Sequence, residues 1–188
     1  FFKGYYAYGF KDHRSKGMAE VEYSFDKKEY LPREFPKHSI TGTFKYDVIA
    51  PTDKFLKTDK DNVFTSFKTT TVDQMMYERD ISLKYERETE YGLKTTIQLR
   101  NTNDEPTGKL VYLRNNAERT LVRDITTTEA SLSFRYAPGE TFINTKQRRI
   151  PVSLDAPVFT LSHTTGFKGV LGGEYNYNLT EAGIYKRF

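Results

Sequence analysis

The stretch MAEVEYSFD, residues 18–26, alternates apolar and polar side chains without a break. Apolar residues take the odd positions and polar or acidic residues the even ones: Ala19, Val21, Tyr23 and Phe25 against Glu20, Glu22, Ser24 and Asp26. Because successive side chains of a β-strand point to opposite faces, the stretch predicts a strand with one apolar and one acidic face. The alternation alone leaves open whether the apolar face contacts a protein core or lipid.

The same alternation recurs in four further runs, at residues 40–48, 77–85, 93–99 and 130–136. The turn-like ETEYG, residues 88–92, joins two of these runs into a predicted β-hairpin. Segments rich in Pro, Gly, Asn and Asp interrupt the pattern at 28–38, 50–55, 100–108, 114–119 and 137–157, and they predict turns and loops. We therefore expect an all-β antiparallel meander of about eight or nine strands, several of them about 9 to 11 residues long.

Composition excludes several classes of protein. Hydrophobic residues make up 37% of the 188 residues, mean hydropathy is −0.70, and no run approaches the roughly 18 apolar residues of a membrane helix. The chain contains no cysteine, so it has no disulfide framework, thiolate nucleophile or cysteine-based metal site. A net charge of +4 from 29 basic and 25 acidic residues is ordinary, and we expect no nucleic-acid partner.

A membrane β-barrel remains compatible with this low hydropathy, because its strands need apolar residues only at every second position. Three features favour a barrel over a soluble β-sandwich: long strands, charges of both signs on the polar faces, and aromatic residues near strand ends. Those aromatic residues are Tyr23, Phe25, Tyr46, Tyr77, Tyr91 and Tyr136. The opening, FFKGYYAYGF, has no initiator Met and no signal-peptide pattern, so we expect a section of a longer protein.

Several longer stretches resemble one known family. They are SLSFRYAPGETF (131–142), the whole of residues 148–188, GYYAYGFKD (4–12) and YSFDKKEY (23–30). Together they are similar to the family called domain of unknown function 5686, whose members occur in Gram-negative bacteria of the Bacteroidetes group. Such members join an N-terminal carboxypeptidase-regulatory-like sandwich to a C-terminal region expected to form an outer-membrane β-barrel.

The resemblance implies that residues 1–188 are a single section of a partial outer-membrane transmembrane β-barrel, without the sandwich and the closing strands. It assigns the odd positions from Ala19 to Phe25 to lipid and its interface, and Glu20, Glu22 and Asp26 to a polar lumen. The implied partners are membrane lipid, including lipopolysaccharide, and periplasmic or surface proteins. The family is similar in plan to the barrels of the outer-membrane assembly machinery, but their arginine-glycine-aromatic loop tip is absent here.

The implied function is non-enzymatic support of protein assembly, export or surface attachment. A solute channel or transporter component and a soluble β-sandwich binding module are the alternatives. We expect no catalytic residue, no cofactor and no metal site. Ser162 and His163 are adjacent on a predicted strand and so cannot pair, and His13 and His38 lack partners at ligand spacing. Glu86, Glu88 and Glu90 form a row on one strand face, without a predicted partner on a second strand.

Five charged residues remain as candidate contacts in loops or in the lumen. Arg148 and Arg149 lie in the longest irregular stretch, where they could bind phosphate or carboxylate groups. The other three are Arg135, Glu174 and Glu181.

Overall fold

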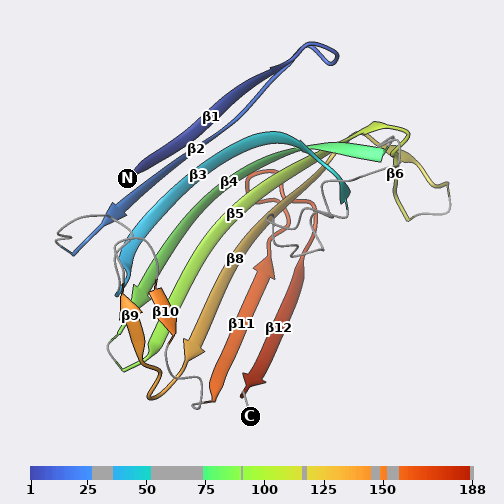
Figure 1. The fold of residues 1–188 in the computed structure, drawn as a ribbon. Helices are drawn as coiled ribbons and strands as arrows, with labels where there is room; N and C mark the ends of the chain where they lie inside the picture. The colour runs from blue at the N-terminus through green and yellow to red at the C-terminus, as the bar shows by residue number, and fades with distance from the viewer. Residues whose placement is uncertain are drawn as a thin grey trace.

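The computed structural model describes residues 1–26, 36–51, 74–89, 91–115, 118–144, 149–151 and 157–186. Eight strands of this part form one antiparallel sheet, in the order β1-β2-β3-β4-β5-β8-β11-β12 (Figure 1). Their bounds are β1 Phe2–Gly9, β2 Arg14–Ser24, β3 His38–Ile49, β4 Gln74–Glu88, β5 Leu93–Gly108, β8 Ile125–Tyr136, β11 Val158–Gly166 and β12 Tyr177–Tyr185. The predicted all-β antiparallel meander is therefore confirmed.

Two short hairpins interrupt the meander. β6 (Tyr112–Leu113) pairs with β7 (Leu121–Val122), and β9 (Phe142–Asn144) pairs with β10 (Arg149–Pro151). The second hairpin lies inside 137–157, which the sequence predicted to be irregular throughout. Its strands are only three residues long, too short for alternation to reveal them.

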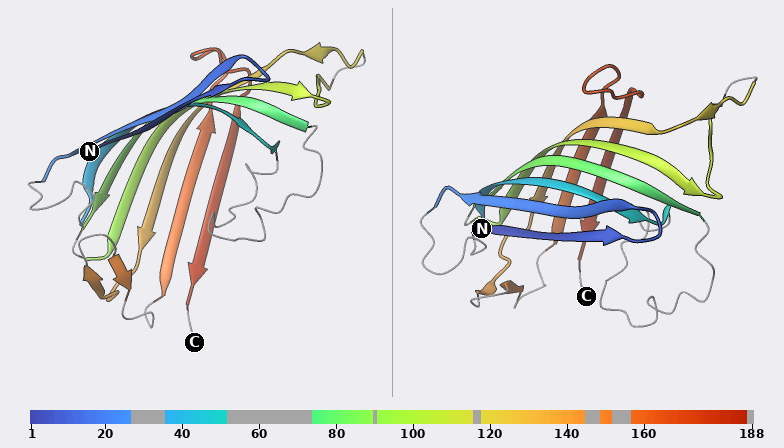
Figure 2. Two further views of the ribbon diagram at one scale, coloured as in Figure 1. Left: turned by 45° about the horizontal axis from the view of Figure 1, so that its top comes forward. Right: turned by 90° about the horizontal axis from the view of Figure 1, so that it is seen from above.

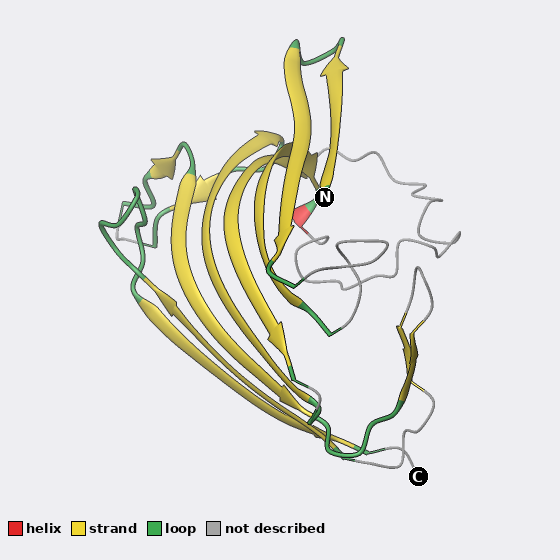
Figure 3. Ribbon diagram, turned by 90° about the vertical axis from the view of Figure 1, so that its left-hand side faces the viewer, coloured by secondary structure: helices red, strands yellow, loops and turns green. Residues whose placement is uncertain are grey.

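The sheet is curved and open. Figures 2 and 3 show the strands bending into a trough, with the β9–β10 hairpin on the concave side. β1 and β12 are the two edges, and the described strands form no closed barrel. Within the described residues, no helix is long and apolar enough to cross a membrane.

The predicted hairpin at 88–92 is confirmed as the β4–β5 connection. The amide of Thr89 donates to the carbonyl of Leu93 (2.8 Å), and the amide of Gly92 donates to that of Thr89 (3.2 Å). Gly92 has φ of +79°, a left-handed conformation that glycine adopts without steric cost. The amide of Ala137 donates to the Gly92 carbonyl (3.0 Å), which ties the turn to the end of β8.

The predicted break at 100–108 is wrong, because β5 continues through this segment to Gly108. Pro106 lies opposite Met76 of β4, within a regular register. The pairing of β5 with β8 ends at Asp104, so that side of β5 is an unpaired edge near the proline. A proline, which has no amide hydrogen, is tolerated at such an edge.

Gly92→Ala should destabilise the fold more than Gly139→Ala does. Both glycines have positive φ, so both variants carry a strain of about 1–2 kcal/mol. A Cβ at Gly92 would also lie 2.3 Å from the carbonyl oxygen of Ala137, whereas one at Gly139 would meet no atom within 4 Å. We expect Gly92→Ala to lower the free energy of unfolding by roughly 1–3 kcal/mol more than Gly139→Ala does, measured by urea unfolding followed by circular dichroism. Equal losses in the two variants would contradict the tight turn.

Candidate functional site

The two faces of the sheet have opposite character, and the apolar face is the exposed one. Val21 is 54% exposed, while the neighbouring Glu22 is 4% exposed. The register continues the face of Val21 through Gly42 and Leu83 to Leu99. The exposed apolar side chains of this outer face are here called the apolar belt. They are Phe2, Val21, Phe44, Ile81, Leu83, Ile97, Leu99, Leu132, Phe134, Phe159, Leu161 and Ile184.

One edge of the apolar belt runs obliquely across the strands. The first polar residues beyond it are Arg79 on β4, Asn101 on β5, Thr128 on β8, His163 on β11 and Thr180 on β12. Residues paired in register define a line perpendicular to the strands. The line through Thr180 on β12 passes His163 on β11 and Leu132 on β8, and it meets β4 at Tyr85. Tyr85 is six residues from Arg79, where the edge of the belt crosses β4. Six residues span ~20 Å along a strand and four strand spacings ~19 Å across the sheet, so the edge crosses the strands at roughly 45°.

A described loop covers part of the outer face just beyond that edge. The hydroxyl of Thr128 donates to the carbonyl of Val170 (2.8 Å), and the side-chain amide of Asn101 donates to that of Leu171 (3.1 Å). Both polar side chains are buried as a result. The loop between β11 and β12 therefore packs on polar side chains of β5 and β8.

The aromatic residues predicted near strand ends are only partly arranged as expected. Tyr23 and Phe25 contact each other edge to face, and Tyr136 stacks on Phe159 of β11, so both pairs lie on the outer face toward one end of the strands. Tyr91 lies exposed in the β4–β5 turn. Tyr77 departs from the expectation, because it is buried beneath residues of the β1–β2 hairpin.

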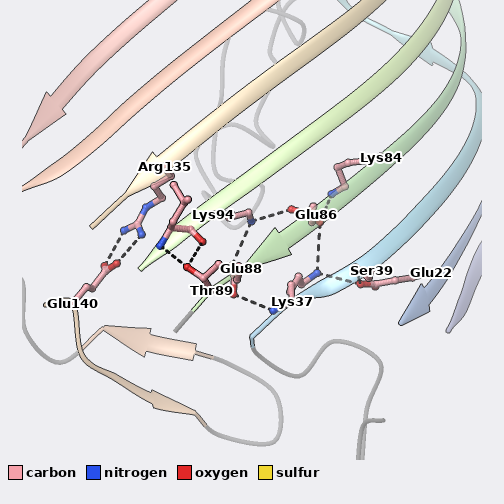
Figure 4. Close-up of polar contacts among 11 residues, drawn as sticks. Glu22, Lys37, Ser39, Lys84, Glu86, Glu88, Thr89, Lys94, Arg135 and Glu140 are labelled. Atoms are coloured by element: carbon pink, nitrogen blue, oxygen red, sulfur yellow. Dashed lines mark hydrogen bonds and ion pairs between the residues drawn. The ribbon is translucent and has the colours of Figure 1, made fainter. Parts of the chain in front are cut away.

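The inner face carries a network of ion pairs and hydrogen bonds (Figure 4). The ammonium group of Lys37 lies 3.3 Å from the Glu22 carboxylate and 3.9 Å from that of Glu86. The hydroxyl of Ser39 also donates to Glu22, at 3.1 Å. Because Glu22 is almost fully buried, these partners replace the water that its carboxylate lost.

Glu86 is the centre of this inner-face network. Its two carboxylate oxygens lie 2.9 Å from the ammonium groups of Lys84 and Lys94, which come from β4 and β5. Lys94 also lies 3.7 Å from Glu88. The acidic row of β4 thus has lysine partners on a second strand, contrary to the sequence prediction, and Glu90 lies outside the described residues. The sequence did contain a signal for one of these pairs. Pairing residues outward from the predicted ETEYG turn places Glu88 directly opposite Lys94.

A second polar cluster joins the β1–β2 hairpin to β3, β4 and β5. The guanidinium of Arg14 donates to both carboxylate oxygens of Glu105 (2.7 and 3.0 Å) and to the Tyr46 hydroxyl (2.9 Å). It also lies 4.2 Å from the centre of the Tyr77 ring, a cation–π geometry. Arg14 and Glu105 are separated by 91 residues, so no sequence spacing could have indicated the pair.

Asp12 completes this second cluster from the β1–β2 turn. Its carboxylate lies 2.6 Å from the ammonium of Lys16 and accepts a 2.7 Å hydrogen bond from the Tyr77 hydroxyl. These two partners hold the pKa of Asp12 well below its usual range. The carboxylate therefore stays ionised, and its charge is offset by Lys16.

Of the five candidate contact residues, Arg135, Glu174 and Glu181 have described side chains, and these three do not form one site. Arg135 makes a bidentate ion pair with Glu140 at 2.7 and 2.8 Å, next to the β9–β10 hairpin. Glu174 accepts from the amide of Thr126 and lies 3.8 Å from Arg114, on the loop that precedes β12. Glu181 is exposed on β12, where it accepts from Ser162 at 3.4 Å. Arg149 begins β10 opposite Asn144, and Arg148 lies outside the described residues.

The histidines occupy separate places. His163 lies opposite Leu132 on the outer face and contacts the hydroxyl of Thr180 at 2.7 Å, whereas Ser162 lies opposite Ser133 on the inner face. The prediction that Ser162 and His163 point to opposite faces is confirmed. His38 contacts Asp26, and His13 lies in the β1–β2 turn. No group of three or more potential metal ligands occurs among the described residues.

Comparison with known proteins gives one match. The model of the C-terminal domain of the family of unknown function DUF5686 matches residues 1–188. No curated protein and no solved structure matches the chain. The family resemblance inferred from the sequence is thereby confirmed.

Glu86→Gln should destabilise the sheet, because it leaves the positive charges of Lys84, Lys94 and Lys37 close together without the central carboxylate. We expect a loss of about 1–3 kcal/mol in the free energy of unfolding, measured by urea titration. Glu181→Gln is the matched control, since this exposed carboxylate has one weak hydrogen bond, and it should change stability by less than about 0.5 kcal/mol. An unchanged free energy of unfolding in Glu86→Gln would show that the network contributes no stability.

Proposed function

We propose that this chain, which belongs to the DUF5686 C-terminal domain family, is a section of an outer-membrane β-barrel. Its apolar belt faces lipid, and its ionic inner face lines a polar lumen. In this role the strands satisfy one another's backbone groups, so that polypeptide crosses hydrocarbon without unpaired amides. The observation that carries the proposal is the inverted burial, in which carboxylates are covered and large apolar side chains are exposed.

The inverted burial argues against a soluble sandwich. A sandwich buries its apolar face against a second sheet, and such burial is the main favourable term in folding. The described residues provide no second sheet over the belt, because β6–β7 and β9–β10 are two-stranded and short. Lipid is the environment in which an exposed apolar belt of this extent is stable.

The oblique edge of the belt gives independent support. Strands of membrane barrels tilt by about 35–45° from the barrel axis. A band of constant depth in the bilayer is perpendicular to that axis, so it must cross the strands at about 45–55°. The edge from Arg79 to Thr180 crosses at roughly 45°, as estimated from the spacing within and between strands. The tilt also accounts for polar residues such as His163 on the outer face, because they lie beyond the edge.

Within this role, we propose non-enzymatic support of protein assembly, export or surface attachment. The inner face carries charges of both signs that are paired with one another, as at Lys45–Glu78 (3.4 Å) and Arg100–Asp80 (2.7 Å). Paired charges suit a stable wall of a lumen. A solute channel is the second candidate, favoured by the polarity of the same face, and planar-bilayer recordings separate the two because only the channel predicts stable ion conductance.

The membrane placement is tested by fractionation and by detergent dependence. The protein should sediment with the outer membrane and should require detergent to stay dispersed. A monodisperse, detergent-free monomer with a cooperative thermal transition would contradict the proposal.

Leu132→Arg should impair membrane insertion far more than Ser133→Arg. Leu132 lies in the middle of the belt on β8, and arginine on a lipid-facing surface costs about 2–4 kcal/mol near the bilayer midplane. Ser133 points to the inner face, where arginine should cost less than about 1 kcal/mol. The measurement is the fraction folded into lipid vesicles as urea is varied. Equal effects of the two variants would contradict the assignment of the two faces. Ser133 is a better inner-face control than Glu22, because Glu22 is buried and ion-paired.

A further inference from the structure

The loop between β11 and β12, residues 167–176, is fastened to the outer face of the sheet by its backbone. The amide of Phe167 donates to the carbonyl of Thr128 (2.8 Å), and the amide of Glu174 donates to the carbonyl of Thr126 (3.0 Å). Two side-chain hydrogen bonds from β5 and β8 to carbonyls of the loop add to these. The loop therefore has a defined position over the two strands.

Leu171, at the tip of this loop, holds a backbone conformation that favours glycine. Its φ is +47°, in the left-handed region, which a residue with a Cβ adopts at a steric cost. Gly169 and Gly172 have φ of +83° and +82°, so the loop has this backbone shape at three positions and a side chain at one of them. That side chain is 75% exposed, so packing within the chain does little to offset the strain. Leu171 thus presents a large apolar group outward.

The whole loop has the composition of a segment at a membrane interface. Its sequence, FKGVLGGEYN, contains four large apolar or aromatic residues, three glycines, one lysine, one glutamate and one asparagine. All four large residues are exposed, from 38% at Phe167 to 75% at Leu171, with Val170 and Tyr175 between them. Exposed aliphatic and aromatic side chains beside a lysine are typical of chains that lie at the boundary of headgroups and acyl chains.

The loop borders the apolar belt. The carbonyl of Leu171 accepts from Asn101, and the next outer-face residue on β5 is Leu99, a belt residue that is 54% exposed. On β8, Thr128 holds the carbonyl of Val170 and lies just beyond the row that contains Leu99. The exposed apolar surface therefore continues from the belt onto the loop. With the belt in hydrocarbon, the loop lies at the level of the interface.

We propose that residues 167–176 are an interfacial anchor, in which Val170 and Leu171 enter the boundary between lipid headgroups and acyl chains. The proposal rests on the membrane placement proposed above and adds to it a lipid contact at a defined depth. Lipid is the partner because the exposed surface of the loop is continuous with the belt. The long side chain of Lys168 can extend from this position to the headgroup phosphates. Because the loop is bonded to β5 and β8, the anchor fixes the depth of that part of the wall.

The test measures the depth of a label at Leu171. A nitrobenzoxadiazole fluorophore is attached to Leu171→Cys in the full-length protein, folded into phosphatidylcholine vesicles. Residues 1–188 contain no native cysteine, and labelled unsubstituted protein gives the background from the rest of the protein. Lipids with a nitroxide quencher near the headgroup should quench this label more strongly than lipids with the quencher at the end of the acyl chain. Circular dichroism verifies that each variant is folded.

Two labelled variants are the controls. Leu132→Cys, in the middle of the belt, should be quenched more strongly by the deep nitroxide, and Ser133→Cys, on the inner face, should be quenched least. If Leu132→Cys is quenched by lipid but Leu171→Cys is not, the anchor is overturned, whether iodide reaches the Leu171 label from water or another protein shields it. Absence of lipid quenching at Leu132→Cys would instead overturn the membrane placement, so the two failures are distinguishable.

Discussion

Backbone hydrogen bonding between eight antiparallel strands is the interaction on which this structure depends. Among the described residues, the buried hydrophobic side chains are only Ala50, Met76, Tyr77 and Ala137, which is too little apolar burial for an ordinary core. The ladder from β1 to β12 is continuous, and β4 and β5 alone pair over fifteen residues each, from Gln74 to Glu88 and from Lys94 to Gly108. The backbone ladder, and not an apolar core, therefore holds these strands together.

The ionic inner face complements this ladder. Glu86 lies among Lys84, Lys94 and Lys37, so each charge has an opposite charge close by. Buried ion pairs often contribute little net stability compared with apolar residues, but removal of one partner is costly. Their effect here is to fix the positions of neighbouring strands, because Lys94 and Glu86 come from different strands and meet only in the native register. Electrostatics thus reinforces the register that the backbone sets.

Contacts at the two ends of the strands hold segments that the ladder leaves loose. The pairing of β2 with β3 ends at Gly17 and Tyr46, and beyond it the Arg14–Glu105 ion pair attaches the hairpin to β5. At the opposite end, the Arg135–Glu140 pair attaches the segment that leads to β9. Both pairs are bidentate arginine–carboxylate contacts, the geometry that gives the strongest and most directional ion pairs.

The sequence by itself determined the strands at 18–26, 40–48, 77–85, 93–99 and 130–136, and which of their side chains share a face. Residues 18–26 show why: the two-residue period of a strand is local, so alternation identifies both faces without knowledge of any neighbour. The β4–β5 hairpin followed for the same reason, from a turn between two alternating runs. The family could also be inferred from the sequence, although the candidate contacts at Arg135, Glu174 and Glu181 could not be grouped, because nothing local indicates their partners.

Only the tertiary structure decided what each face contacts and how far each strand extends. β5 continues through Pro106 because β8 begins only at Ile125, opposite Asp104, and does not pair with the proline; this is a fact about a neighbouring strand and not about the segment itself. Glu22 is buried, and Arg14 meets Glu105, because register and curvature bring distant residues together. The oblique apolar belt likewise exists only across several strands, since its angle depends on how each strand is aligned with the next.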